Sequence, residues 1–281
     1  MYPSYIVSLA DTYAHEKSVT SKFTPATKVE FLNCAVRELV NEVRDVFPYF
    51  GMVSTTIDQT QGTETTSMIS DLDRVIHMRG NTDKSQEVLY QNMLTDLGSG
   101  WSMTDKDFVW INYDTTGTYE VQYTRLPWDC HYGTAAAFAA TTVTITVSAT
   151  GPKWSGGGFY NDYYNGCKLY ALSSTTNYGQ EFTVTDFAGS TGVFTGTWDG
   201  DTPTGEGTLV YEVQPMINPR EWYQLLAWEV ALMMKSIGRG EDAPLPRNHP
   251  YKRLRQQFIT KYRSRSERMP GYGAFRGLSR T

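Results

Sequence analysis

Helical patterns occur near both ends of this chain and enclose a long stretch of strand-like sequence. One amphipathic helix is predicted over residues 25–47, and two further helices are predicted over residues 219–238 and 250–265. Because an apolar helical stripe must be buried against another element, we expect these helices to pack together as a base. The predicted fold class is therefore α+β, with a three-helix base, antiparallel β regions and an inserted small β-barrel or sandwich.

The helix boundaries are marked by capping residues and prolines. Thr24 precedes Pro25 as an N-cap before a proline at the first helical position, and Pro48 ends the first helix. Asn218 and Pro219 give the second helix the same start, and Gly238 follows its last turn. Its apolar residues cover most of its circumference, which predicts a helix buried on several sides.

The sequence between the helices has two parts of different composition. In the first part, strands are predicted at residues 52–59, 72–78, 109–113 and 119–123, with a hairpin turn at 115–117 between the last two. The segment 84–92 fits either a short helix or a strand. The second part, 129–213, is poor in Lys, Arg and Glu. Its predicted strands recur about every ten residues, at 142–148, 167–172, 181–185, 192–197 and 208–213. This spacing predicts a small antiparallel barrel or sandwich that folds autonomously.

These patterns predict a domain organisation. Residues 1–24 show no clear period and are expected to form an N-terminal arm. Residues 25–128 and 214–265 form the helical base with its β-sheet, residues 129–213 form the inserted β module, and residues 266–281 form a flexible basic tail.

Charge is distributed unevenly along the chain. The segment 247–281 has ten Lys or Arg residues and one acidic residue, which gives a net charge of +9. The remaining residues have 15 basic and 29 acidic side chains, a net charge of −14. The basic segment is typical of a contact with an acidic partner, another subunit or nucleic acid, although a solvated terminal helix fits the same pattern.

No catalytic or metal-binding motif is present. The four histidines (His15, His77, His131 and His249) form no metal-ligand pattern, and there is no phosphate-binding or nucleophile motif. The glycine run 156–158, the Asp199-Gly200-Asp201 sequence and the Asp71/Asp73 pair fit turns and loops better than phosphate, calcium or acid–base sites. We therefore expect no enzyme activity, no metal and no cofactor.

The cysteines and the apolar runs predict where the chain folds. Cys34, Cys130 and Cys167 fit neither a zinc spacing nor a disulfide framework, which indicates a reducing compartment. The first residues lack the pattern of a secretory signal, and the longest apolar run, 225–234, is interrupted by Glu229. No membrane association is expected.

Glu229 is the charged residue that we single out, because it lies within the apolar arc of the second predicted helix. A buried carboxylate needs a cationic or hydrogen-bonding partner. The candidates on the other helices are Arg37, Arg44, Arg253 and Arg255, so the residue is predicted to form a structural salt bridge.

Aromatic residues are concentrated at the start of the inserted module. They are Trp154, Phe159, Tyr160, Tyr163, Tyr164 and Tyr170. Three roles fit this group: a sugar-binding platform, a protein interface, or the core of a small barrel whose thin layers need large side chains.

Three segments resemble the head–tail adaptor, or connector, proteins of tailed bacteriophages. They are the helix KVEFLNCAVRELVNEV with the aromatic end Phe47–Phe50, the strand YEVQYTRLPWDC from Tyr119 to Cys130, and the late helix EWYQLLAWEVALMMKSIGRGED from Glu221 to Asp242. Residues 157–213, which contain GFYNDYYNG and close near Tyr211, look like a small β module inserted in several phage structural proteins.

The resemblance implies a non-enzymatic virion protein of the head–tail interface, which is present in the host cytoplasm during assembly. It would form a ring of twelve copies between the portal and a tail or nozzle protein, and it would contact channel DNA without sequence specificity. The candidate portal contacts are Lys261, Arg263, Arg265, Arg268, Arg276 and Arg280, and the candidate interface aromatics are Trp154, Phe159, Tyr160, Tyr163 and Tyr164. The alternative class is a carbohydrate-binding or tail-spike module that uses the aromatic insert.

Overall fold

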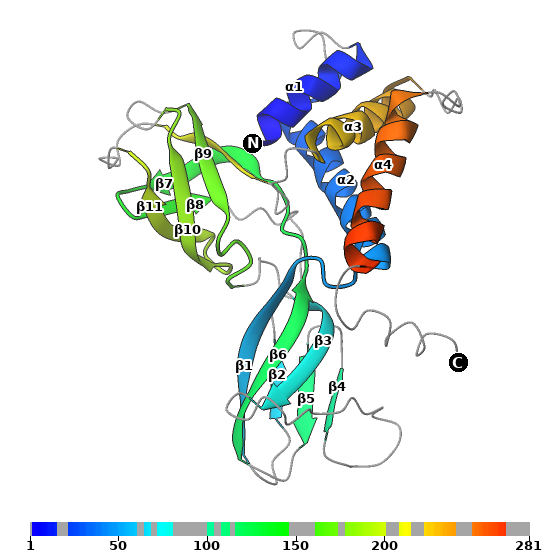
Figure 1. The fold of residues 1–281 in the computed structure, drawn as a ribbon. Helices are drawn as coiled ribbons and strands as arrows, with labels where there is room; N and C mark the ends of the chain where they lie inside the picture. The colour runs from blue at the N-terminus through cyan, green and yellow to red at the C-terminus, as the bar shows by residue number, and fades with distance from the viewer. Residues whose placement is uncertain are drawn as a thin grey trace. The chain divides into compact units, whose positions relative to one another are not determined.

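The computed structural model has a mixed α+β architecture of four helices and antiparallel sheets, one of which closes into a six-stranded barrel. It describes residues 2–15, 22–60, 65–68, 72–80, 100–103, 108–112, 116–145, 161–173, 178–200, 208–214, 222–239 and 249–267. The chain divides into two compact units, residues 1–48 with 127–281 and residues 49–126. Figure 1 shows the elements of both.

The first unit contains all four helices: α1 (Pro3–Ala14), α2 (Pro25–Val46), α3 (Trp222–Arg239) and α4 (Pro250–Glu267). Helix α2 packs against α3 and α4, and α3 also contacts α4 (Figure 1). The apolar stripes of helices from the two ends of the chain are thus buried together, as expected. The side chain of Thr24 caps α2, because its Oγ1 accepts a hydrogen bond from the backbone N–H of Thr27 at 3.2 Å.

The helical part contains four helices rather than the three predicted. The additional helix, α1, lies where an arm without regular structure was expected, and it packs against α3 and α2. Its buried apolar stripe consists of Ile6, Ala10 and Ala14, one residue per turn. Because two of these three residues are small, the sequence pattern is too weak to predict a helix, and packing against α3 supplies the stability that the stripe alone does not.

The closed barrel occupies residues 132–213 of the same unit. Its strand order is β10-β11-β8-β7-β12-β9, and the strands are β7 (Tyr132–Phe138), β8 (Thr142–Ile145), β9 (Lys168–Ser173), β10 (Glu181–Ala188), β11 (Val193–Trp198) and β12 (Val210–Val213). Strand β7, which runs YGTAAAF, was not predicted because its run of small residues has no alternating apolar pattern. Gly196 allows close strand packing, since a Cβ there would lie 2.0 Å from the carbonyl oxygen of Thr183.

Aromatic side chains fill the barrel. Tyr164, Phe182, Phe187, Phe194 and Tyr211 are fully buried, and Tyr164 meets Phe187 edge-on at a centroid distance of 5.0 Å. A small barrel has little interior volume, so large side chains from few positions fill it.

The second unit contains two three-stranded antiparallel sheets, with strand orders β1-β6-β3 and β2-β5-β4. The strands are β1 (Met52–Gln59), β2 (Thr65–Met68), β3 (Leu72–Gly80), β4 (Gly100–Met103), β5 (Phe108–Asn112) and β6 (Gly117–Arg125). The predicted hairpin between β5 and β6 is wrong, because β5 pairs with β2 and β4 whereas β6 pairs with β1 and β3. Turn-forming residues at 115–117 do not decide which strands pair; the burial of each strand's apolar face does.

The buried side of the β1-β6-β3 sheet consists of Ile57, Leu72, Met78, Tyr119, Val121 and Tyr123. No helix among the described residues is both long and apolar enough to span a membrane. The ambiguous segment 84–92 and the cap at Asn218 and Pro219 lie outside the described residues.

Candidate assembly interface

Helices α2, α3 and α4 are joined by a partly buried ionic network centred on Glu229. Its Oε1 accepts hydrogen bonds from the Tyr251 hydroxyl at 2.5 Å and from Arg255 Nη1 at 3.1 Å. Arg255 in turn reaches α2, where its Nη2 lies 3.0 Å from Glu42 Oε2. One guanidinium therefore connects carboxylates of two helices from opposite ends of the chain.

Of the four arginines considered as partners for Glu229, only Arg255 is paired with it in the described structure. Arg37 binds Asp129 instead, Arg44 is buried in α2, and Arg253 is exposed on α4. Burial raises the pKa of Glu229, and the Tyr251 hydroxyl and Arg255 oppose this rise by stabilising the carboxylate. Tyr251 and Arg255 of the same chain thus bind the carboxylate of Glu229, as in a structural ion pair.

A second polar contact fixes the segment that leads from β6 to the barrel. The side-chain amide of Asn33 on α2 accepts a hydrogen bond from Cys130 N at 2.7 Å and donates one to Cys130 O at 3.0 Å. One turn further along α2, Arg37 binds the two carboxylate oxygens of Asp129, with Nε–Oδ1 and Nη2–Oδ2 distances of 3.1 and 2.5 Å. Adjacent residues of the segment are therefore clamped to adjacent turns of one helix.

Asp129 is also held from the barrel side. Its backbone N–H donates to the Tyr163 hydroxyl at 3.0 Å, and that hydroxyl donates to Pro127 O at 3.2 Å. Burial raises the pKa of Asp129, whereas Arg37 acts in the opposite direction. The indole of Trp128 donates to Gln214 O at 2.9 Å, which joins the two chain segments where they enter and leave the barrel.

The N-terminus of helix α1 is attached to the barrel by a carboxylate of the barrel. Glu212 of β12 accepts hydrogen bonds from Ser4 N and Ser4 Oγ, both at 2.7 Å. The helix has no capping side chain of its own, so Glu212 satisfies a free N–H of its first turn and complements the positive end of its dipole. Just before the helix, Tyr2 stacks on Tyr170 of the barrel with ring centroids 4.4 Å apart.

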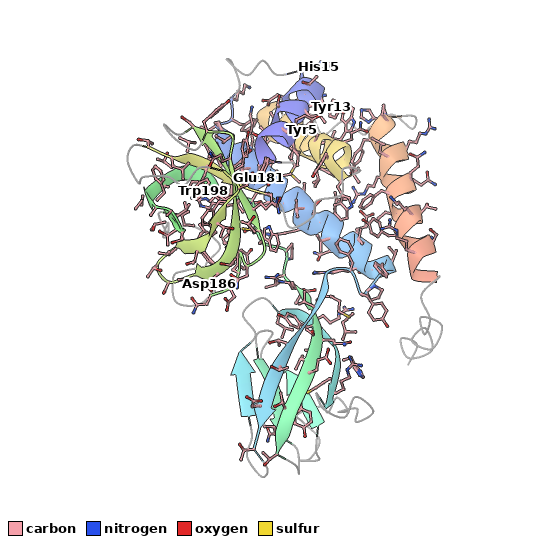
Figure 2. All side chains as sticks on the ribbon, turned by 60° about the vertical axis from the view of Figure 1, so that its left-hand side comes forward. Tyr5, Tyr13, His15, Glu181, Asp186 and Trp198 are labelled. Carbon is pink, nitrogen blue, oxygen red and sulfur yellow. The ribbon has the colours of Figure 1, made fainter. Side chains whose placement is uncertain are left out.

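The other end of α1 is attached to the helices. Lys28 of α2 donates to Asp11 at 2.5 Å in a buried ion pair, and Tyr13 stacks on Trp228 of α3 at 4.2 Å. Figure 2 shows Tyr5, Tyr13 and His15 along this helix. Because α1 contacts both the barrel and α3, it links the barrel to the helical base.

The candidate portal contacts divide into described and undescribed residues. Lys261, Arg263 and Arg265 lie on the second half of α4, where Arg263 and Arg265 are exposed and Lys261 is half-buried. The guanidinium of Arg265 lies 5.4 Å from the centroid of the Tyr262 ring. Arg268, Arg276 and Arg280 lie outside the described residues.

The aromatic candidates do not form an exposed group. Tyr163 and Tyr164 are 3% and 0% exposed and belong to the barrel core, so neither of them is available to an external ligand or partner. Trp154, Phe159 and Tyr160 lie outside the described residues. Tyr163 and Tyr164 thus help to fill the core of a small barrel, which is one of the three roles that fit the aromatic group.

The remaining polar candidates take part in local structure. Asp199 Oδ1 accepts a hydrogen bond from Glu181 N at 2.8 Å, and Asp201 lies outside the described residues. Asp73, which was expected in a loop, lies in β3, and its Oδ2 accepts a hydrogen bond from Thr124. His131 is stacked on Tyr211, and burial lowers its pKa. No group of three or more metal-ligating side chains occurs among the residues that the structure describes.

Sequence reasoning missed Asn33, Asp129 and Glu212, although one signal was available for Glu212. It lies in the sequence LVYEVQP, a charged residue within an apolar strand of a module that is poor in Lys, Arg and Glu. Such a residue predicts a buried carboxylate with a specific partner, as Glu229 did. Asn33 and Asp129 carry no comparable signal, because their partners are created by tertiary contacts.

The comparisons with known proteins add no family assignment. No protein family model matches the sequence, and no curated protein matches it.

Proposed function

We propose that this chain is a structural, non-enzymatic virion protein that acts as a head–tail adaptor of a tailed bacteriophage, forming a ring between portal and tail. The observation that carries the proposal is the joining of both chain ends in one helical base, where α2 packs on α3 and α4. Such a base is suited to rigid repetition around a ring, and the β regions inserted in it are suited to contacts with other proteins.

The polar groups of the base support a structural role. Arg255 pairs with both Glu229 and Glu42 between helices, and Arg37 pairs with Asp129 at the barrel entrance. Groups that are already paired within the chain stiffen the helices. A virion component that transmits load needs this rigidity more than it needs a catalytic centre.

The second half of α4 is proposed to meet the portal together with the segment that follows it. Lys261, Arg263 and Arg265 belong to a segment with a net charge of +9, and they would face an acidic portal surface. Long-range attraction would accelerate docking and would weaken with added salt. DNA in the channel is the alternative partner, and its binding would fall steeply with salt and be independent of sequence.

The β regions are proposed to contact the tail or nozzle protein. The carbohydrate-binding or tail-spike alternative relied on the aromatic cluster of the insert, and the burial of Tyr163 and Tyr164 removes two of its members from any sugar platform. The adaptor proposal does not depend on that cluster.

Size-exclusion chromatography with light scattering, followed by negative-stain microscopy, tests the proposal. The purified chain is expected as a large ring, or as a weakly associating monomer that forms rings when mixed with portal rings of the same phage. A stable trimer would contradict an adaptor and support a spike.

The role of the basic segment is tested by truncation after Met269, which removes Arg276 and Arg280. Portal attachment is expected to weaken, and the loss should be largest at low salt, where charge attraction acts at longest range. Unchanged attachment, measured by co-sedimentation with portal rings, would show that these residues do not dock.

A further inference from the structure

The outer face of α2 is acidic. Cys34, Glu38, Asn41 and Asp45 are exposed, and at about 100° per residue they lie opposite the buried stripe that includes Leu32, Val36 and Val43. Glu38 also precedes Glu42 by four residues, so like charges are neighbours along the helix, and both raise the pKa of Glu229. Arg255 is shared between Glu42 and Glu229 and makes no recorded contact with Glu38 or Asp45.

The outer face of α4 is basic. Lys252, Arg253 and Arg263 are exposed on the side away from the buried residues Tyr251, Phe258 and Tyr262. From residue 250 to residue 265 the sequence contains no acidic residue. Over its full length, Pro250–Glu267, the helix has six basic residues and one acidic residue, Glu267, at its last position, so it has a net positive charge.

The two faces are directed away from each other within one chain. The buried stripes of α2 and α4 converge on a shared core, and α3 contacts both helices, so the exposed sides diverge. Opposite charges on diverging surfaces cannot neutralise each other inside the molecule. Each concentration of like charge is unfavourable by itself, and both are relieved when the faces of different molecules meet.

We propose that the acidic outer face of α2 in one copy binds the basic outer face of α4 in the next copy, with Glu38 and Asp45 facing Arg253 and Arg263. The occupant of each face is thus a second copy of this chain. The inference rests on the proposed ring and names the contact that builds it. It also reassigns Arg263 from the portal to the neighbouring copy, whereas Lys261 and Arg265 lie outside this arc and remain portal candidates.

The contact is head-to-tail rather than two-fold. In a two-fold dimer the same patches meet on both subunits, and diverging faces cannot both be used in one contact. A contact between two different patches leaves one free patch on each end of every assembly, so it continues until a ring closes, or as an open filament where the rotation between copies does not close. The proposed ring requires the first of these.

Cysteine cross-linking tests this arrangement even where association is weak. Cys34 lies on the acidic face, whereas Cys130 and Cys167 are buried, and Gln256 is exposed between Lys252 and Arg263 on the basic face. Under mild oxidation Q256C is expected to give a ladder of disulfide-linked oligomers on a non-reducing gel. The double variant C34S/Q256C mixed with the unmodified chain should give linked dimers only, which shows that the bond forms between molecules.

Charge reversal then tests the role of the charged side chains. In the Q256C background, E38K/D45K and R253E/R263E are each expected to reduce the ladder about tenfold or more, because each variant juxtaposes like charges. An equimolar mixture of the two should restore it, because each reversed face then meets an opposite one. The controls D186K, on the barrel (Figure 2), and R74E, on β3, reverse exposed charges outside both faces and should leave the ladder unchanged.

The outcomes separate the contact from the proposed function. Rings seen by microscopy without a Q256C ladder, or reversed variants that are not rescued by mixing, would overturn the contact and leave the adaptor proposal standing. A rescued ladder in a chain that does not bind portal rings would support the contact and contradict the adaptor. A variant R253E/R263E that keeps the ladder but loses binding to double-stranded DNA would assign the basic face to nucleic acid and overturn the inference.

Discussion

The buried carboxylates Glu229 and Glu212 are stabilised by different kinds of donor. Glu229 has a guanidinium and a phenol as partners, so its charge is partly balanced by another charge. Glu212 is fully buried and is bound by the hydroxyl and backbone N–H of Ser4, at the positive end of α1. Burial raises the pKa of both residues. Each carboxylate joins two elements, so its loss should affect more than its own helix or strand.

Replacing Glu229 with Ala is expected to reduce the free energy of unfolding by about 2–3 kcal/mol, because buried donors on Tyr251 and Arg255 lose their acceptor. The cost stays below the upper range for broken ion pairs because Arg255 is about a third exposed and keeps Glu42. Urea denaturation measures this change in the free energy of unfolding. The control, Asp186→Ala at an exposed position of β10, should change stability by less than about 0.5 kcal/mol, and equal effects of the two would contradict a partly buried network.

Replacing Glu212 with Gln should alter how stability depends on pH. The folded-state pKa of Glu212 lies above its ordinary value of 4.5, so the folded chain holds this proton more tightly than the unfolded chain. The stability associated with this proton is therefore fully present below about pH 4.5 and is lost as the pH rises through the folded pKa. Denaturation of both proteins between pH 4.5 and 7.5 should show the unmodified chain gaining stability relative to Glu212→Gln as the pH falls, whereas a pH-independent difference would exclude this titration.

At the scale of elements, α2 organises the first unit. One side of it carries the apolar stripe that contacts α3 and α4, and Asn33 and Arg37 bind the segment that leads into the barrel. Lys28 binds α1 through Asp11. A single helix thus positions the other three helices and the barrel entrance, which explains why its capping and periodicity are so clear in the sequence.

Replacing Asn33 with Ala tests the clamp on Cys130. The change leaves the backbone N–H and C=O of Cys130 without their partner in a buried place, so a loss of about 2–3 kcal/mol is expected. Asn41→Ala on the exposed face of the same helix is the matched control, because it makes the same chemical change without breaking the clamp. Thermal denaturation should show a clear decrease in Tm for Asn33→Ala and almost none for Asn41→Ala; similar decreases would mean that the clamp contributes little.

Elements with strong local signals were predictable from the sequence. Residues 25–46, 222–239 and 250–267 have helical periodicity, and β1, β8 and β10–β12 have β-branched or alternating patterns. Helix α1 and strands β2, β4 and β7 were not predicted. The inward residues of α1 are mainly alanines, and β7 buries only Phe138 while two of its three alanines are exposed, so neither has a clear apolar pattern. The β5–β6 hairpin was predicted wrongly because local turn residues do not determine which distant strands a segment joins.

The residues of the candidate site were also predictable only where the sequence carries a local signal. A charge inside an apolar helical stripe predicted that Glu229 needs a partner, and the sequence limited that partner to four arginines without selecting Arg255. The role of Tyr163 and Tyr164 depended on which way a strand connection faces, and composition does not specify this. Asn33 and Asp129 are polar residues at ordinary positions, and only the approach of residue 130 to α2 gives them a function.

At the scale of the whole molecule, the two inserted β regions differ in how they are joined to the helices. Residues 49–126 form a compact unit of their own, and its entry and exit strands are paired, with Met52 opposite Thr124. The barrel belongs to the same unit as the helices and holds α1 through Glu212. The ends of the barrel are also close, because the indole of Trp128 reaches Gln214. Both regions can therefore be removed with short connections, but the consequences should differ.

Replacing residues 53–123 with Asn-Gly should leave the helices and barrel folded. The dipeptide forms a two-residue turn between Met52 and Thr124, which are already paired as antiparallel neighbours. Removing residues 131–213 instead deprives the N-terminal end of α1 of Glu212 and of the stack on Tyr170, so its first turns should unfold, whereas Asp11 and Tyr13 still bind α2 and α3. Limited proteolysis distinguishes the two variants, because unfolded turns of α1 are cleaved within its own sequence. Rapid cleavage inside residues 3–14 is expected only for the variant without the barrel, and protection of α1 in that variant would show that Lys28, Trp228 and α3 hold the helix without the barrel.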